Sequence, residues 1–278
     1  MKNIILILLC LLPFVCNAQD KSGLANMNMS VTYHADYVKN TMDMNKKRPD
    51  RMILRISGQS SEFYSLLSDR RRVIQDSMLS IGFSTADIEK EKAKIPRSTQ
   101  YYRVYKNYPN KGRLTYIEQM IKPWYRYEET LERPVWKLQD EKKEIIGYKC
   151  QKATTLFRGR AWIVWFTNEI PISDGPWKLW GLPGLILEAA DANDIYHFTA
   201  LGIKKNDKTS IIQPLKNQYI NCTRKDLHKL KVEEAKDPLA FLNKSLGLDM
   251  KIKEVDSKGK EVSLESNEYI GMETDITN

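Results

Sequence analysis

The chain has 278 residues, 42% of them hydrophobic, and carries a formal net charge of +9. This length suits one large globular domain or two small ones, and the hydrophobic content is ordinary for a folded chain. The basic residues are interleaved with acids and form no long block, which argues against nucleic acid as a partner.

The N-terminus has the pattern of a secretory signal peptide. A short basic start precedes an apolar run over residues 4–15, and Ala18 provides a small residue before a cleavage point. We predict a signal peptide over residues 1–18 and an exported protein, in the periplasm or outside the cell. Acylation at Cys16 is the alternative, which the bulky residues before it disfavour. The apolar run is too short to span a bilayer and no later run is longer, so no transmembrane segment is expected.

Alternation of apolar and polar residues predicts β-strands over most of the chain. The predicted strands are 29–33, 52–56, 62–67, 101–106, 113–120, 124–129, 145–156, 160–167, 185–188, 195–201 and 250–255. Helical spacing predicts a helix over 69–81, and capping residues predict further helices after Ser84, Thr223 and Asp237. Short polar links, such as residues 139–143, join consecutive strands and favour antiparallel pairing.

These elements predict an α+β fold. Its main part is a curled, mostly antiparallel β-sheet, a half-barrel or barrel-like meander, with a few packed helices. Since no Gly/Ser-rich or Pro-rich linker interrupts the chain, we predict a single domain over residues 19–278, with a polar tail after about residue 257.

All six tryptophans lie between Trp124 and Trp180. A strand over 162–166 with bulky apolar groups on both faces indicates that most of them belong to the core. Trp177 and Trp180 lie beside an irregular loop and are the candidate ligand-binding residues on a concave surface.

Residues with reactive side chains form no known catalytic or metal-binding motif. The sequence has no His-Glu-x-x-His, Gly-x-Ser-x-Gly, phosphate loop or Cys-x-x-Cys, so no metal, cofactor or catalytic residue is predicted. His34, His197 and His228 are read as structural or exposed histidines. Cys150 and Cys222, the cysteines that follow the signal peptide, are compatible with one disulfide or with two free thiols.

Carboxylates offer two acid/base candidates, neither of them strong. Glu128 and Glu129 are adjacent in a strand and therefore point to opposite faces. Glu188 lies near Asp191 and Asp194, which fall in a probable hairpin loop where aspartates are usual turn formers.

An irregular loop from residue 175 to 186 is the most informative stretch. Its glycines and prolines exclude a helix, and residues 182–185 have the pattern of a type II turn with Gly184 at φ > 0. The motif residues are Gly175, Pro176, Gly181, Leu182, Pro183, Gly184, Leu185 and Ile186. The last six spell Gly-Leu-Pro-Gly-Leu-Ile, and this hexapeptide resembles the signature of the GLPGLI family. Residues 147–154, 158–160, 165–167 and 169–176 resemble the family pattern in the same order.

The resemblance implies a secreted or periplasmic bacterial protein that accompanies an outer-membrane receptor or a secreted enzyme, and it supplies no catalytic residues. With no catalytic motif, we expect a non-enzymatic protein that binds such a partner or an apolar or amphipathic ligand. A secreted hydrolase using carboxylates near the Gly-Leu-Pro-Gly loop is the first alternative. An extracellular scaffold module is the second.

Overall fold

The structure is a computed structural model, and it describes residues 28–38, 47–98, 100–121, 123–205, 207, 212, 218–249, 254–255, 261–262 and 269–276. The predicted signal peptide and its cleavage site lie outside these residues. Most of the tail after residue 257 lies outside them as well.

A single twelve-stranded sheet dominates the described part of the chain. Its strands are β1 (Asn28–Val38), β2 (Lys47–Ser57), β3 (Ser60–Ser65), β4 (Tyr102–Lys106), β5 (Arg113–Gln119), β6 (Trp124–Thr130), β7 (Lys137–Ile145), β8 (Tyr148–Phe157), β9 (Arg160–Thr167), β10 (Leu185–Asp191), β11 (Tyr196–Lys205) and β12 (Tyr219–Asn221). A separate pair consists of β13 (Glu254–Val255) and β14 (Glu261–Val262).

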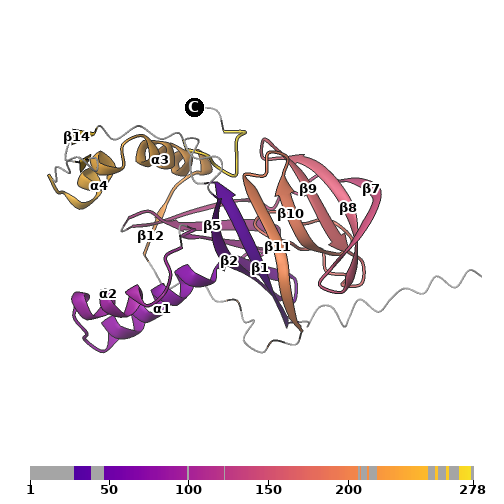
Figure 1. The fold of residues 1–278 in the computed structure, drawn as a ribbon, viewed down its shortest axis with the longest axis horizontal. Helices are drawn as coiled ribbons and strands as arrows, with labels where there is room; N and C mark the ends of the chain where they lie inside the picture. The colour runs from indigo at the N-terminus through magenta and orange to yellow at the C-terminus, as the bar shows by residue number, and fades with distance from the viewer. Residues whose placement is uncertain are drawn as a thin grey trace, which may run out of the picture.

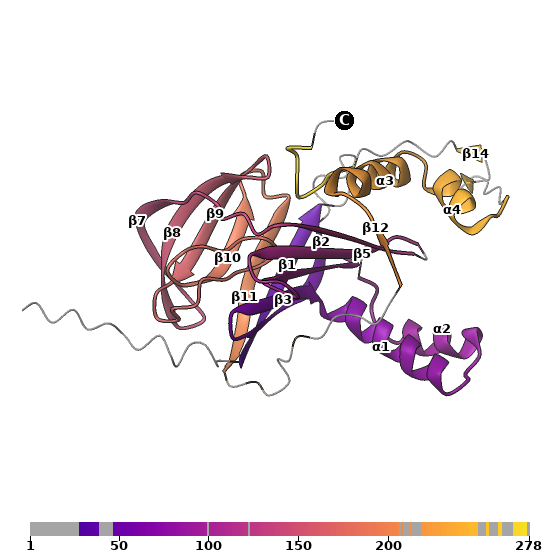
Figure 2. The same cartoon turned by 180° about the vertical axis from the view of Figure 1, so that it is seen from behind.

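The strand order is β12-β6-β5-β4-β3-β2-β1-β11-β10-β9-β8-β7. Every described pair in this sheet is antiparallel except β12 with β6, which is parallel. The sheet curls strongly (Figures 1 and 2), but β12 and β7 remain its two edges. The prediction of a curled, mostly antiparallel sheet with a few helices is therefore confirmed, in an open form rather than a closed barrel.

The helices form two pairs: α1 (Leu66–Ser80) with α2 (Thr85–Ala93), and α3 (Arg224–Lys236) with α4 (Pro238–Leu246). Each begins at a residue whose side chain accepts a backbone N–H, namely Ser65, Ser84, Thr223 and Asp237. Both pairs lie at the same end of the molecule, away from β7 to β9 (Figure 1).

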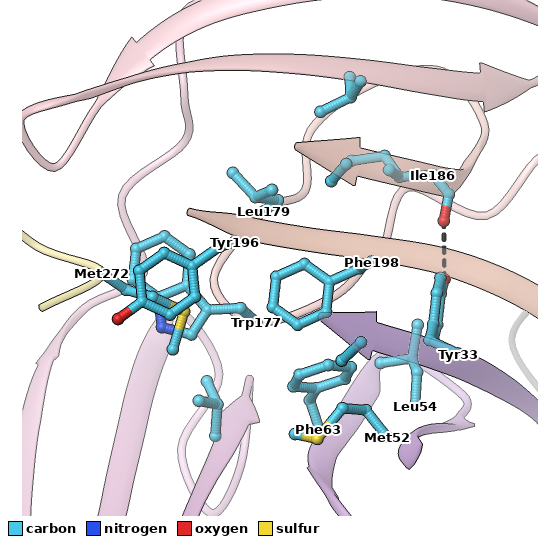
Figure 3. Packing of buried hydrophobic residues seen from close by; sticks show 14 of the residues in the cluster. Tyr33, Met52, Leu54, Phe63, Trp177, Leu179, Ile186, Tyr196, Phe198 and Met272 are labelled. Carbon is cyan, nitrogen blue, oxygen red and sulfur yellow. Dashed lines mark hydrogen bonds between the residues drawn. The ribbon is translucent and has the colours of Figure 1, made fainter. Parts of the chain in front are cut away.

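The core lies inside the curl and is rich in aromatic rings. Phe63 meets Phe198 edge to face with ring centroids 5.7 Å apart, and Tyr33 packs on Phe63 at 6.1 Å. The Tyr33 hydroxyl donates to the Ile186 carbonyl at 2.7 Å, which joins β1 to β10 across the interior (Figure 3). Burial of each such ring contributes about 1.5–3 kcal/mol, and the hydrogen bond removes the cost of burying the hydroxyl.

The prediction of a polar link at residues 139–143 is wrong, because these residues lie within β7. This strand is an edge of the sheet and is exposed over most of its length, so it has no apolar alternation to reveal it. Its pairing with β8 also shifts register between Leu138 and Lys142. The connection is instead the tight turn at Ile146 and Gly147, both of which have positive φ.

Candidate functional site

A cavity of about 1330 Å³ lies between the two helix pairs. Strands β4, β5 and β6 contribute its floor, α1 and α2 one wall, and α3 and α4 the opposite wall. Residues of the C-terminal segment 269–276 complete the lining. The cavity is therefore built by segments that are far apart in the sequence.

Three tyrosines from adjacent strands form the floor. Tyr102 stacks on Tyr116 with centroids 5.7 Å apart, and Tyr116 stacks on Tyr127 at 5.0 Å. Burial is the main cause that raises the pKa of all three phenols well above 10, so the hydroxyls are neutral hydrogen-bonding groups. The Tyr116 hydroxyl donates to the Glu118 carboxylate at 2.9 Å, because positions two apart in a strand share a face.

Glu118 also forms an ion pair with Lys231 of α3, with Nζ and Oε2 2.6 Å apart. Burial disfavours the Lys231 charge, but Glu118 and Tyr269 outweigh it and raise the pKa of Lys231 above its usual value. A carboxylate from the floor and an ammonium from the wall thus meet inside the cavity as charged groups.

His228, three residues before Lys231 on α3, also lines the cavity. Burial, followed by the Lys231 charge, lowers the pKa of His228 below its ordinary value of about 6.5. The imidazole is therefore neutral at pH 7 and can accept a proton. Its ring meets Tyr269 edge to face at 5.6 Å.

A second charged cluster lies around Lys178, in the loop singled out by the sequence. The Lys178 ammonium donates to Glu129 at 2.6 Å, to Glu273 at 2.5 Å and to the Tyr127 hydroxyl at 2.9 Å. Arg224 lies 3.6 Å from the other oxygen of Glu273. Of these groups, Tyr127, Glu273 and Arg224 line the cavity.

Lys106 of β4 anchors the loop that carries Lys178. Its buried ammonium pairs with Asp174 and donates to the carbonyls of Gly175 at 2.8 Å and Leu179 at 3.2 Å. Burial lowers the pKa of Lys106, and the Asp174 carboxylate opposes that shift. One side chain therefore holds the loop at two backbone carbonyls and at the Asp174 carboxylate.

The expected type II turn with a left-handed Gly184 is wrong. The Leu185 N–H donates to the carbonyl of Ile170 rather than to that of Leu182. Within this loop, the glycine with positive φ is Gly181, at 97°. Gly184 is required for a different reason: a Cβ there would lie 1.9 Å from the Thr167 carbonyl oxygen. Close approach of two backbone segments excludes a side chain at this position.

The two candidate ligand-binding tryptophans differ in their surroundings. Trp177 is buried, borders the cavity and packs on Trp162 with centroids 5.5 Å apart. Trp180 is not among the described residues that line the cavity, and its indole N–H donates to the Glu132 carbonyl at 2.8 Å. Cys150 and Cys222 are both free thiols in the structure.

The carboxylates and histidines considered from the sequence fall into separate clusters, in one of which His197 lies 3.5 Å from Glu188 and 3.3 Å from Asp194. Glu129 belongs to the Lys178 cluster, whereas Glu188 lies near His197 and bonds Lys143. The nearby Glu188 carboxylate is the main cause that raises the pKa of His197. Among the residues that the structure describes, no group of three His, Cys, Asp or Glu side chains is arranged to hold a metal ion.

Sequence reasoning missed Glu118, Lys231, Tyr269 and Glu273, and read His228 as structural or exposed. Their convergence comes from the curl of the sheet and the return of the chain end, which no local spacing encodes. The one available signal was the Tyr116-x-Glu118 pair, which places a phenol and a carboxylate on one face of a predicted strand.

The fold and cavity define an open, curled β-sheet domain with a charged aromatic cavity under two helix pairs. Residues 68–227, more than half of the chain, match the family model described as "N-glycanase peptide, N-terminal domain". The chain belongs to this family.

Among solved structures, the chain is similar to PNGF-II in two crystal forms, P21 and C2. Sequence identity is 16% and 15%, and the TM-score is 0.47 for both. Each match covers 73% of this chain but 32% of the PNGF-II chain, so this chain spans about a third of that protein's length. No curated protein matches the chain.

The family match overturns two predictions from the sequence. The GLPGLI assignment is wrong, because the family shown is that of N-glycanase N-terminal domains. The expectation of a non-enzymatic binding protein is corrected by the same match, since an N-glycanase is an enzyme. Over the described residues, no helix is long and apolar enough to cross a membrane.

Proposed function

We propose that the protein is an exported hydrolase of N-linked glycans, and that the cavity between the helix pairs receives the glycan and takes part in its removal from a peptide. The observation that carries this proposal is the match to the N-glycanase family over residues 68–227. The matched range includes β4, β5 and β6, the strands that build the cavity floor.

The chemistry of the cavity suits a carbohydrate. Sugars present both hydroxyl groups and apolar C–H faces, so their sites combine aromatic surface with a few fixed polar groups. Tyr101, Trp124 and Tyr269, none of them fully buried, supply aromatic surface along the lining. Glu118 and Lys231 supply a charged acceptor and a charged donor.

Hydrolysis of an N-linked glycan at its asparagine requires the transfer of protons. A base takes a proton from the attacking water, and an acid gives one to the departing nitrogen. His228, whose pKa is lowered by burial, is one base that the cavity offers, and the carboxyl groups of Glu118 and Glu273 face the same space. Glu273 contacts Lys178 of the Gly-Leu-Pro-Gly loop, so the proposal agrees with a hydrolase that uses carboxylates near that loop.

The predicted signal peptide supports a location in the periplasm or outside the cell, where N-glycosylated peptides from the surroundings are accessible. The proposal concerns this chain, which corresponds to about a third of the length of PNGF-II.

The test is the release of glycan from a defined N-glycosylated peptide, followed by mass spectrometry of both products. We expect release by the wild-type protein and a loss of about 100-fold or more for His228→Asn and Glu118→Gln, the usual effect of removing an acid/base group. Glu144→Gln, an exposed carboxylate on β7, is the matched control and should keep full activity. Absence of release by the wild type, or full activity in both cavity variants, contradicts the proposal.

A further inference from the structure

Lys178 is a buried lysine whose three hydrogen-bond partners come from two distant segments. Its side chain is 1% exposed. Glu129 and Tyr127 lie on β6, and Glu273 lies in the C-terminal segment 269–276. An ammonium has three donors, and all three are used here. Since a buried charge is stable only when paired and hydrogen-bonded, the position of Lys178 is coupled to the positions of these partners.

The loop holds Lys178 rigidly from below the cavity. Lys106 fixes the backbone on both sides, at Gly175 and Leu179. The preceding Trp177 is locked by ring contacts with Trp162 at 5.5 Å and Phe157 at 6.2 Å. The ammonium group is therefore presented at a fixed point, and it does not itself line the cavity.

The C-terminal segment has other anchors, but Glu273 is its contact with the Lys178 ammonium. Arg224 of α3 donates to the Asp275 carboxylate at 3.0 Å. The Gly271 carbonyl accepts hydrogen bonds from Arg160, one at 3.0 Å, and the Ile270 carbonyl accepts one from the Tyr196 hydroxyl at 2.6 Å. The Thr274 N–H donates to the Arg158 carbonyl at 2.9 Å. Glu273 is the residue of this segment that reaches the Lys178 ammonium while also lining the cavity. Met272, its neighbour, belongs to the buried cluster with Trp177 and Tyr196 (Figure 3).

We propose that Lys178 is a positioning residue for the cavity: it fixes the Glu273 carboxylate, and with it the wall formed by residues 269–276. The loop around Lys178 reaches the cavity through Trp177, which borders it, and through the Lys178 contacts with Tyr127 and Glu273. The effect on catalysis rests on the function proposed above, whereas the effect on the wall does not.

Hydrogen–deuterium exchange of the full chain tests the structural part of the proposal, that Lys178 fixes residues 269–276. In Glu273→Gln, the Lys178–Glu129 pair remains, so the fold should be retained. We expect exchange over residues 269–276 to accelerate about tenfold, as for the loss of one charge-assisted hydrogen bond, while β1 to β3 keep their wild-type protection. Lys149→Met, an exposed lysine on β8, is the matched control and should leave the segment unchanged.

Lys178→Met should loosen the same segment, and Lys178→Arg should restore part of its protection. Lys178→Met also removes one of three cations around Glu129, leaving Arg158 at 3.3 Å and Arg224 at 3.8 Å. The double variant Lys178→Met/Glu129→Gln therefore separates the effect of the unbalanced Glu129 charge from the local effect on Glu273. We expect the double variant to regain thermal stability but not the protection of residues 269–276. Wild-type protection of this segment in Glu273→Gln, or in the double variant, overturns the proposal.

Glycan release provides the catalytic half of the test. Lys178→Met/Glu129→Gln should raise KM more than it lowers kcat and should shift the pH profile, because the Glu273 carboxylate loses its hydrogen bond from Lys178 and keeps only Arg224 at 3.6 Å. A purely structural lysine would lower the amount of folded enzyme and leave both the KM and the pH profile unchanged; that result also overturns the proposal. If the wild type releases no glycan, the proposed function fails, and the exchange measurements still decide the role of Lys178.

Discussion

Replacing Gly184 by alanine would force a methyl group against the backbone of β9. The added Cβ would lie 1.9 Å from the Thr167 carbonyl oxygen and 2.6 Å from its carbonyl carbon. These are main-chain atoms of a paired strand, so they cannot move away by a change of side-chain rotamer. The φ angle of Gly184 is outside the left-handed region, and the whole effect is therefore steric.

Overpacking of a core costs about 1–3 kcal/mol, and contact with backbone places this substitution at about 3 kcal/mol. For a chain of this size, each 1 kcal/mol lowers Tm by about 2–4 °C, so Gly184→Ala should lower it by about 6–12 °C. Gly202→Ala on β11 is the control, because no atom lies within 4 Å of its Cβ position. Its stability should change by less than about 0.5 kcal/mol.

Thermal unfolding followed by circular dichroism compares the two variants directly. If Gly184→Ala has the same Tm as Gly202→Ala and the wild type, β9 and the loop can separate without a loss of stability. The steric account of this loop would then be wrong.

Three further predictions concern charge and thiol chemistry. Lys106→Met removes the cation that pairs with Asp174 and donates to two loop carbonyls. Urea unfolding should show a loss of about 3 kcal/mol or more in stability, whereas the control Lys149→Met, at an exposed position, should lose none. The nearby Glu188 carboxylate raises the pKa of His197 in the folded state, so the stabilisation by this pair is complete below about pH 6.5 and is lost as pH rises through the folded pKa. The Tm of His197→Gln measured across this range should lack that decline. Burial raises the pKa of the Cys150 thiol to about 11, so iodoacetamide at neutral pH should label Cys150 only after unfolding. The half-buried Cys222 should be labelled as a second free thiol in the unfolded protein without reductant. Mass spectrometry that finds neither cysteine labelled would indicate a disulfide.

The strands that alternate in burial could be predicted from the sequence. β1 buries every second residue from Met29 to Tyr37, and its period-two pattern is clear. The helix starts at Ser84 and Thr223 could be predicted equally well, because a capping side chain acts within one turn. β7 could not be found, because an exposed edge strand has no buried face to impose a pattern.

The site could be predicted from the sequence less well than the fold. The loop around Gly184 was recognised as unusual, but its reason, contact with Thr167, depends on a partner 17 positions away in the sequence. The cavity depends on longer-range geometry still. Lys231 meets Glu118 because α3 and β5 line the same cavity, and Glu273 meets Lys178 because segment 269–276 returns to the loop. No local pattern carries this information.

The most direct test of the central claim is to locate a bound N-glycopeptide on the protein. Hydrogen–deuterium exchange with the glycopeptide should protect α3, β5 and β6 around Glu118 and His228, and the same peptide without its glycan should protect none of them. Equal protection by both peptides, or protection confined to the far strands β7 and β8, would contradict the assignment of this cavity to glycan binding.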